Sequence, residues 1–406
     1  MSFDYFCAMK RFLHILFLLA AFVSSAHSFD FSKDTRISLL TSDGSDRAIF
    51  TRWGHTAIRV NSPSNNVDVV FNYGVFAFDN GFVFKFVRGW TDYCLGAWDF
   101  EYSLDETIQK NSNYYEQVLN LTPSETEHLA NALLNNYRPE NRFYRYNFFY
   151  DNCSTRPRRM IENNVDGTVS YPASNNDSIH TYRDYIHQLL STARWYEFGI
   201  NMCLGSPTDV PLTDEQRLFL PMELKTVMDS AVIVGADGEK RRLVSETQVL
   251  LRHQNEDSKT GFFDVLTPNV LFWLMFLAFI PHVLFYYIKE RDDRWAYVAY
   301  NSVLGLFGLL LFFLTFISVH PCVCPNYSLL WCSPLHMILA SLVYVKSAQK
   351  TEYALFAVNI FLNILALGVY VTSLQFFDSA FAPIQLSSIL LSAFWIIRRK
   401  KQFQGK

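Results

Sequence analysis

The last third of the chain is built from long apolar stretches, and these constrain its fold more than any other feature of the sequence. Each stretch is close to the ~20 residues that a helix needs to cross a lipid bilayer. They cover residues 268–288, 296–319, 328–345, 352–372 and 380–397. The sequence therefore predicts an all-α membrane domain of five transmembrane helices over residues 268–398, followed by a basic tail, 399–406.

Charged residues in the loops predict the side of the membrane on which each loop lies. Lys and Arg follow the first, third and fifth stretches, whereas the loops 320–327 and 373–379 contain neither residue. Cytoplasmic loops carry the excess of Lys and Arg in membrane proteins. We therefore expect the C-terminus in the cytoplasm and the region before residue 268 on the other side.

Another apolar run, residues 12–23, follows two basic residues near the N-terminus. It is short for a membrane-spanning helix, and Ala26 and Ser28 place small residues where a signal peptidase requires them. Residues 1–28 are therefore predicted to be a secretory signal peptide. An uncleaved anchor helix is the alternative.

Between the signal and the membrane domain, the sequence pattern changes from strands to helices. Strands are expected over 36–40, 57–60, 67–73, 82–87 and 93–100, and helices over 104–119, 125–137, 153–164 and 177–192. Strands followed by helices are typical of an α+β domain. We assign this extracytoplasmic domain to residues 29–204, and residues 205–267 to a connector, possibly a β-hairpin around Gly235 and Gly238.

Charge and motifs exclude several classes of function. A net charge of −3 gives no indication of nucleic-acid binding. The sequence contains no GxxxxGKS/T, GxSxG or HExxH motif, so nothing indicates a nucleotide, serine-hydrolase or zinc-peptidase site. The loop 320–336 contains Cys and His, but their spacing does not suit zinc. We expect neither a cofactor nor a metal.

A thiol and an imidazole remain as the candidate catalytic groups. Cys153, in "YNFFYDNCSTRPRRM", lies at the expected start of a helix, where the pKa of a thiol is lowered. His55, in "RWGHTAIRV", lies at the edge of an expected strand and could serve as its base. A buried small side chain and an ordinary strand-edge histidine are the structural alternatives. Cys94 and Cys203 are candidates for a disulfide in an oxidising compartment.

Further side chains near this pair are candidates for supporting roles. A third group usually orients a catalytic imidazole, and Asn72 is the first choice, with Asp68 the second. Arg156 follows the cysteine closely and is expected to bind a phosphate head group or a carboxylate. A solvated helix face is the alternative for this arginine.

Three motifs carry a resemblance to a known family. In chain order they are "WGHTAIRV", "VFNYGVF" and "YNFFYDNCSTR". They resemble the permuted papain-like (NlpC-like) hydrolases, in which the histidine precedes the cysteine. More closely, the motifs and the five apolar stretches resemble the Lnb-type lipoprotein N-acyltransferases of Bacteroides-like bacteria. The resemblance covers nearly the whole mature chain and implies that Cys153 and His55 are catalytic, with Asn72 and Arg156 beside them.

The resemblance implies acyl transfer at the bacterial inner membrane, with the catalytic domain in the periplasm. The expected partners are a membrane phospholipid as acyl donor, a diacylglyceryl-lipoprotein as acceptor, and the bilayer itself. Substrate contacts are expected from Arg156, Tyr73, Asn152, His320, Asn326 and Trp331. The alternatives are a membrane-tethered cysteine peptidase or amidase acting on cell-wall peptides, and a non-catalytic sensor or scaffold.

Overall fold

The protein is described by a computed structural model that covers residues 30–31, 33–77, 80–172, 180–253, 261–291, 294–345 and 349–404. The predicted signal peptide therefore lies outside the described residues. The chain forms two compact units. The sheet unit contains the described residues of Met1–Ala77, Asp92–Asn175 and Asp214–Asn255, and the membrane unit those of Phe78–Thr91, Asn176–Thr213 and Glu256–Lys406.

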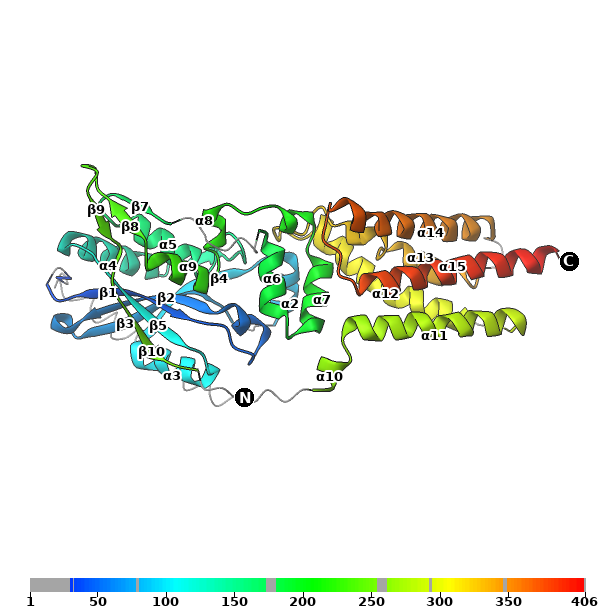
Figure 1. Cartoon of the computed structure of the whole chain (residues 1–406), viewed down its shortest axis with the longest axis horizontal. Coiled ribbons are helices and arrows are strands. Elements are labelled where there is room, and N and C mark those ends of the chain that lie inside the picture. The colour runs from blue at the N-terminus through cyan, green and yellow to red at the C-terminus, as the bar shows by residue number, and fades with distance from the viewer. Residues whose placement is uncertain are drawn as a thin grey trace. The chain divides into compact units, whose positions relative to one another are not determined.

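The sheet unit contains a seven-stranded antiparallel sheet in the order β10-β5-β1-β2-β3-β4-β6 (Figure 1). Its strands are β1 (Arg36–Ser42), β2 (His55–Ser62), β3 (Val67–Val75), β4 (Asp92–Asp99), β5 (Tyr114–Leu119), β6 (Phe143–Arg145) and β10 (Val244–Leu251). A smaller antiparallel sheet contains β7 (Thr168–Ser170), β8 (Val232–Val234) and β9 (Lys240–Arg242).

Helices cover both faces of the larger sheet. The helical segments of this unit are η1 (Ile49–Trp53), η2 (Pro63–Asn65), α3 (Phe100–Lys110), α4 (Pro123–Tyr137), α5 (Thr155–Glu162), α8 (Asp214–Arg217) and α9 (Pro221–Met228). Leu39 and Ile58 pack into the core with α4, α5 and α9, whereas Leu40 and Ala57 pack on the opposite face with α3. Successive side chains of a strand point to opposite faces, so these central strands are apolar on both.

Two predictions of secondary structure were wrong. The helix expected over 104–119 ends at Lys110, because Asn111 adopts a left-handed conformation with φ +53°, and the remaining residues form β5. Pairing with β1 and β10 decides the structure of this segment. The strand expected over 82–87 is helix α2 (Phe82–Arg88), and periodicity alone cannot separate a short apolar strand from a helix.

The region predicted as a connector contributes to the sheet unit. The hairpin expected around Gly235 and Gly238 is present, with β8 and β9 as its strands. β10 pairs with β5 at the edge of the larger sheet, and α9 contributes Leu224 and Met228 to the core. Residues from 214 to 253 therefore complete the fold that begins with β1.

The membrane unit is helical. Its segments are α2, α6 (Tyr182–Leu190), α7 (Arg194–Cys203), η3 (Ser206–Asp209), α10 (Phe262–Val265), α11 (Pro268–Ile288), α12 (Arg294–Phe316), η4 (Tyr327–Leu330), α13 (Leu335–Leu342), α14 (Gln349–Thr372) and α15 (Phe381–Gln404). Within the described residues, four helices are long and apolar enough to cross a membrane, namely α11, α12, α14 and α15. The third predicted stretch, 328–345, contains the shorter η4 and α13. The protein is therefore a multi-pass membrane protein.

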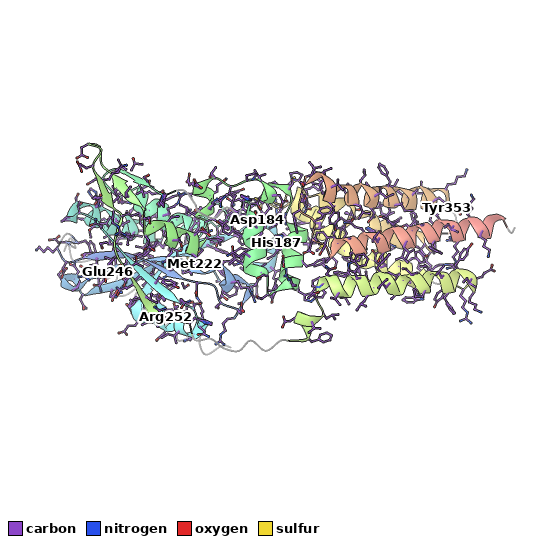
Figure 2. The ribbon with its side chains drawn as sticks, viewed as in Figure 1. Asp184, His187, Met222, Glu246, Arg252 and Tyr353 are labelled. Atoms are coloured by element: carbon purple, nitrogen blue, oxygen red, sulfur yellow. The ribbon has the colours of Figure 1, made fainter. Side chains whose placement is uncertain are left out.

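Helices α6 and α7 belong to the membrane unit, although the sequence analysis assigned them to the first domain. Asp184 and His187 mark α6 in Figure 2. The Asp184 carboxylate accepts the backbone N–H of Thr181 at 2.8 Å and so caps the start of this helix. The His187 ring lies 4.5 Å from that of Phe376, which follows α14. Cys94 and Cys203, the disulfide candidates, are both free thiols.

Gly54 is required by the turn that leads into β2. Its φ is +74°, and an added Cβ would lie 2.6 Å from the carbonyl oxygen of Ser42. We expect Gly54→Ala to lower the free energy of unfolding by roughly 2–3 kcal/mol, from backbone strain and the clash together. Thermal unfolding of the purified protein measures this. Gly238→Ala is the matched control, because Gly238 has φ +83° but no neighbour within 4 Å of an added Cβ. Equal shifts in Tm for the two variants would contradict the prediction.

Candidate functional site

A hydrogen bond between two neighbouring strands determines which tautomer the His55 imidazole adopts. His55 is the first residue of β2, and Asn72 lies on β3. Asn72 Oδ1 lies 2.9 Å from His55 Nε2, and Asn72 Nδ2 donates to the Val70 carbonyl at 3.2 Å. A carbonyl can only accept, so the bond to Val70 fixes the orientation of the Asn72 amide. His55 Nε2 therefore carries the proton, and Nδ1 keeps its lone pair.

The surroundings of His55 keep the imidazole neutral. Burial lowers the pKa of His55 below its ordinary value of 6.5, and the charge of Lys110 lowers it further. The hydrogen bond that His55 donates to Asn72 and the charge of Glu106 raise this pKa. A neutral imidazole with a free lone pair is the form that can take a proton from a nucleophile.

Cys153 lies directly before Ser154, the residue that precedes α5. Its sulfur faces the backbone N–H of Thr56 and the hydroxyl of Ser154. The hydroxyls of Thr56 and Ser154 lie 3.2 Å apart, so the start of β2 and the start of α5 meet beside the sulfur. Since Thr56 follows His55 directly, the fold brings His55, Asn72 and Cys153 into one region.

The pKa of Cys153 differs from the sequence-based expectation. Burial raises the pKa of the thiol, and the N–H of Thr56, its own N–H and the Ser154 hydroxyl offset this only in part. The expectation that the helix start lowers this pKa was wrong, because burial outweighs the local donors. Burial therefore favours the neutral form of both groups, the thiol of Cys153 and the imidazole of His55, which we call the neutral pair.

Asn152 fixes the backbone around Cys153 through its side-chain amide. Its Oδ1 accepts the N–H groups of Ser154 and Thr155 at 2.8 and 3.0 Å. Its Nδ2 donates to the carbonyls of Phe148 and Phe219. The side chain is buried and its amide oxygen and nitrogen are both hydrogen-bonded within the protein. The substrate contact expected from Asn152 stays a prediction.

Aromatic residues pack in a row beside Cys153, and Tyr144 is its most informative member. The rings in contact are Phe76 with Tyr93, Tyr93 with Tyr146, and Tyr146 with Tyr144 and Phe148. Tyr144 and Tyr146 both interact electrostatically with Cys153. Within the described residues, the buried Tyr144 hydroxyl has no hydrogen-bond partner. It is therefore a donor available to an oxygen atom bound at this place.

Two other predicted contacts serve the site indirectly. Arg156 binds Asp151 through Nε and Nη2 at 2.8 and 2.7 Å. Its guanidinium carbon lies 3.5 Å from the centre of the Tyr144 ring, so it orients this tyrosine. Tyr73 is buried and donates its hydroxyl to Asn136 at 2.7 Å. Tyr73 has no exposed polar group for the predicted substrate contact, whereas the Arg156 side chain is 26% exposed and binds Asp151 through Nε and Nη2 only.

The three residues predicted from the loop 320–336 belong to the membrane unit. His320 Nε2 donates to the carbonyl of Phe86. Asn326 donates to two carbonyls of α7 and accepts two further N–H groups. Trp331 is 1% exposed and lies in the apolar core. Asn326 and Trp331 therefore stabilise this unit, and the substrate contact expected from them stays a prediction.

Three residues near the site, Thr56, Ser154 and Tyr144, are not distinguished by the sequence motifs alone. Thr56 and Ser154 directly follow His55 and Cys153 in the motifs already quoted. Their position next to the two candidate catalytic residues is the one feature of the sequence that could have indicated them. Tyr144 precedes Cys153 by nine residues in an aromatic run whose members look alike in sequence. Only the fold distinguishes the member whose hydroxyl has no partner.

Alkylation of Cys153 by iodoacetamide should be slow at pH 7 and should accelerate as the pH rises beyond the ordinary thiol range. The reason is that burial raises the pKa of Cys153, and only the thiolate reacts. Peptide mass spectrometry of the full-length protein measures the rate at this residue, with Cys153→Ser to verify the assignment. A rate that reaches its plateau below pH 7 would indicate a preformed thiolate and contradict the neutral pair.

Comparisons with known families agree with the motifs. The model of the Lnb N-terminal periplasmic domain matches residues 32–188, and that of the Lnb transmembrane domain matches residues 257–402. No curated protein and no solved structure matches the chain. The two matched ranges together cover most of the sequence, in the order expected, and they confirm the predicted resemblance. The chain belongs to the Lnb family.

Proposed function

We propose that the protein is a thiol-dependent lipoprotein N-acyltransferase. It moves an acyl chain from a membrane phospholipid to the α-amine of S-diacylglyceryl-cysteine at the N-terminus of a lipoprotein. The observation that carries the proposal is the arrangement of Asn72, His55 and Cys153, in which an oriented neutral imidazole lies in the region of a buried thiol. Membership of the Lnb family supports a lipoprotein as substrate, and membrane-spanning helices suit substrates that are lipids.

We further infer a permuted papain-like fold for the catalytic domain, which the sequence places at 29–204 and whose sheet residues 214–253 complete, because β2 with His55 precedes Cys153 and α5 in the chain. Residues 328–345 serve as the fifth membrane crossing in this proposal. The loop charges support a cytoplasmic C-terminus and a periplasmic site. Residues 1–28 direct export and are then removed.

The first half of the reaction forms an acyl-enzyme. The Cys153 thiol gives its proton to His55 Nδ1 as its sulfur attacks the ester carbonyl of the phospholipid. The backbone N–H of Cys153 and the Tyr144 hydroxyl donate to the oxyanion, because the N–H groups of Ser154 and Thr155 already bind Asn152. The ester C–O bond then breaks. His55 returns the proton to the departing lysophospholipid, and a thioester remains on Cys153.

The second half transfers the acyl chain. The α-amine of the lipoprotein attacks the thioester carbonyl, and an amide bond forms as the C–S bond breaks. His55 takes a proton from the amine and returns it to the Cys153 sulfur, which restores the neutral pair. A peptidase or amidase would use the same pair with water as the acceptor, so the acceptor decides between the two functions.

Cys153→Ala should abolish N-acylation, because the alanine cannot form the thioester. The assay combines the full-length protein in phosphatidylethanolamine vesicles with a diacylglyceryl lipopeptide, and mass spectrometry detects the N-acyl product. We expect a loss of about 1,000-fold or more, and an acyl thioester on Cys153 of the wild type when phospholipid is the only substrate. Cys324→Ala, which changes an exposed thiol of the membrane unit, is the control. Undiminished transfer of the acyl chain by Cys153→Ala would contradict the proposal. Cleavage of a cell-wall peptide by the wild-type protein would favour the peptidase alternative.

Asn72→Ala should lower kcat/KM by roughly 10–100-fold, because the imidazole loses the group that fixes its tautomer. The hydrogen bond that His55 donates to Asn72 raises the pKa of His55, so its loss should also move the acidic limb of the pH profile to lower pH. Asp68→Asn is the control, because both oxygens of Asp68 bind Arg59 at 2.7 Å and none is directed to His55. An unchanged acidic limb in Asn72→Ala would contradict the role of Asn72 in positioning His55.

A further inference from the structure

Helix α2 exposes large apolar side chains although it belongs to a unit with an extensive apolar core. Val83 is 73% exposed, Phe84 58% and Trp90, just beyond the helix, 43%. Only Val87 packs against the core of the membrane unit among the residues that the structure describes in this helix. A patch of this kind on a rigid element indicates a surface that is covered by something apolar.

The backbone of α2 is fixed to the segment that follows α12. The N–H of Val319 donates to the carbonyl of Arg88 at 3.0 Å, and His320 Nε2 donates to that of Phe86. Gly89 fits so closely that an added Cβ would lie 2.8 Å from the backbone nitrogen of His320. The helix is therefore held at the C-terminal end of α12, a candidate membrane span.

The apolar surface of α2 continues the surface of α12. The rings of Phe84 and Phe313 are 6.4 Å apart. Phe312 and Phe316, on the same turns of α12, are exposed side chains of a membrane-spanning helix and therefore face lipid. The exposed Lys85 and Trp90 give α2 the basic and aromatic residues that are typical of helices lying in a membrane interface.

We propose that α2 is an interfacial helix, with Val83, Phe84 and Trp90 inserted among the acyl chains of the leaflet at the C-terminal end of α12. The loop charges make this the outer leaflet. Helix α10, shortly before α11, also exposes large apolar side chains, since Phe262 and Phe263 are 71% and 67% exposed. The inference requires only that α12 spans the membrane, and it is independent of the proposed acyl transfer.

The test uses a photoreactive residue, p-benzoylphenylalanine, in place of Phe84 in the full-length protein. The protein is reconstituted in vesicles of phosphatidylethanolamine and phosphatidylglycerol, and lipid adducts are measured by mass spectrometry after illumination. The same residue in place of Phe312, on α12, is the positive control. Val249, a half-exposed residue of β10 in the sheet unit, provides the negative control. Val83 provides a second probe position if the change at Phe84 prevents folding.

We expect a yield of lipid adduct at Phe84 close to that at Phe312 and about 10-fold above that at Val249, as for a side chain inserted among acyl chains. A yield no greater than at Val249, at both Phe84 and Val83, would overturn the proposal. A protein adduct in place of a lipid adduct would also overturn it, and would identify a second copy of the chain as the occupant. Because no acyl transfer is measured, the outcome does not depend on the proposed function.

Discussion

The buried amide of Asn152 is the interaction on which the candidate site depends. Four hydrogen bonds join this side chain to the start of α5, to the turn before it and to the segment that leads into α9. A buried amide left without these partners would cost roughly 1–3 kcal/mol for each unmet group. The backbone around Cys153 is thereby fixed from several directions, and the sulfur can face Thr56 at the start of β2. The site is organised by polar groups bonded to the backbone.

The sequence was sufficient to identify His55, Asn72 and Cys153 as candidates, because each lies in a short motif at the end of an element or on a neighbouring strand. It was not sufficient to identify substrate contacts. Tyr73 and Asn152 occur in the same motifs, yet both are buried and bonded within the protein. Whether a polar side chain in a motif meets a ligand or the backbone is decided by tertiary contacts, and these are not visible in residue order.

The fold was predictable from the sequence where apolar stretches were long. The apolar stretches of α11, α12, α14 and α15 are long enough to be recognised by composition alone. Shorter segments were less predictable: β5 is a strand because β10 and β1 pair with it on either side, and α2 is a helix between two glycines of positive φ. In both cases the neighbours in space outweigh the local preference of the residues.

The position of β10 near the end of the sheet unit's sequence has a practical consequence. This strand begins at Val244, long after the candidate site residues, yet it covers one edge of β5. A fragment cut at residue 204 would keep every residue of the candidate site but expose the unpaired N–H and carbonyl groups of β5. Open edges of this kind pair readily with other chains and lead to aggregation. A soluble form of the sheet unit must therefore retain residues 214–253, for instance by joining them to the end of β7 through a short linker in place of the intervening segment.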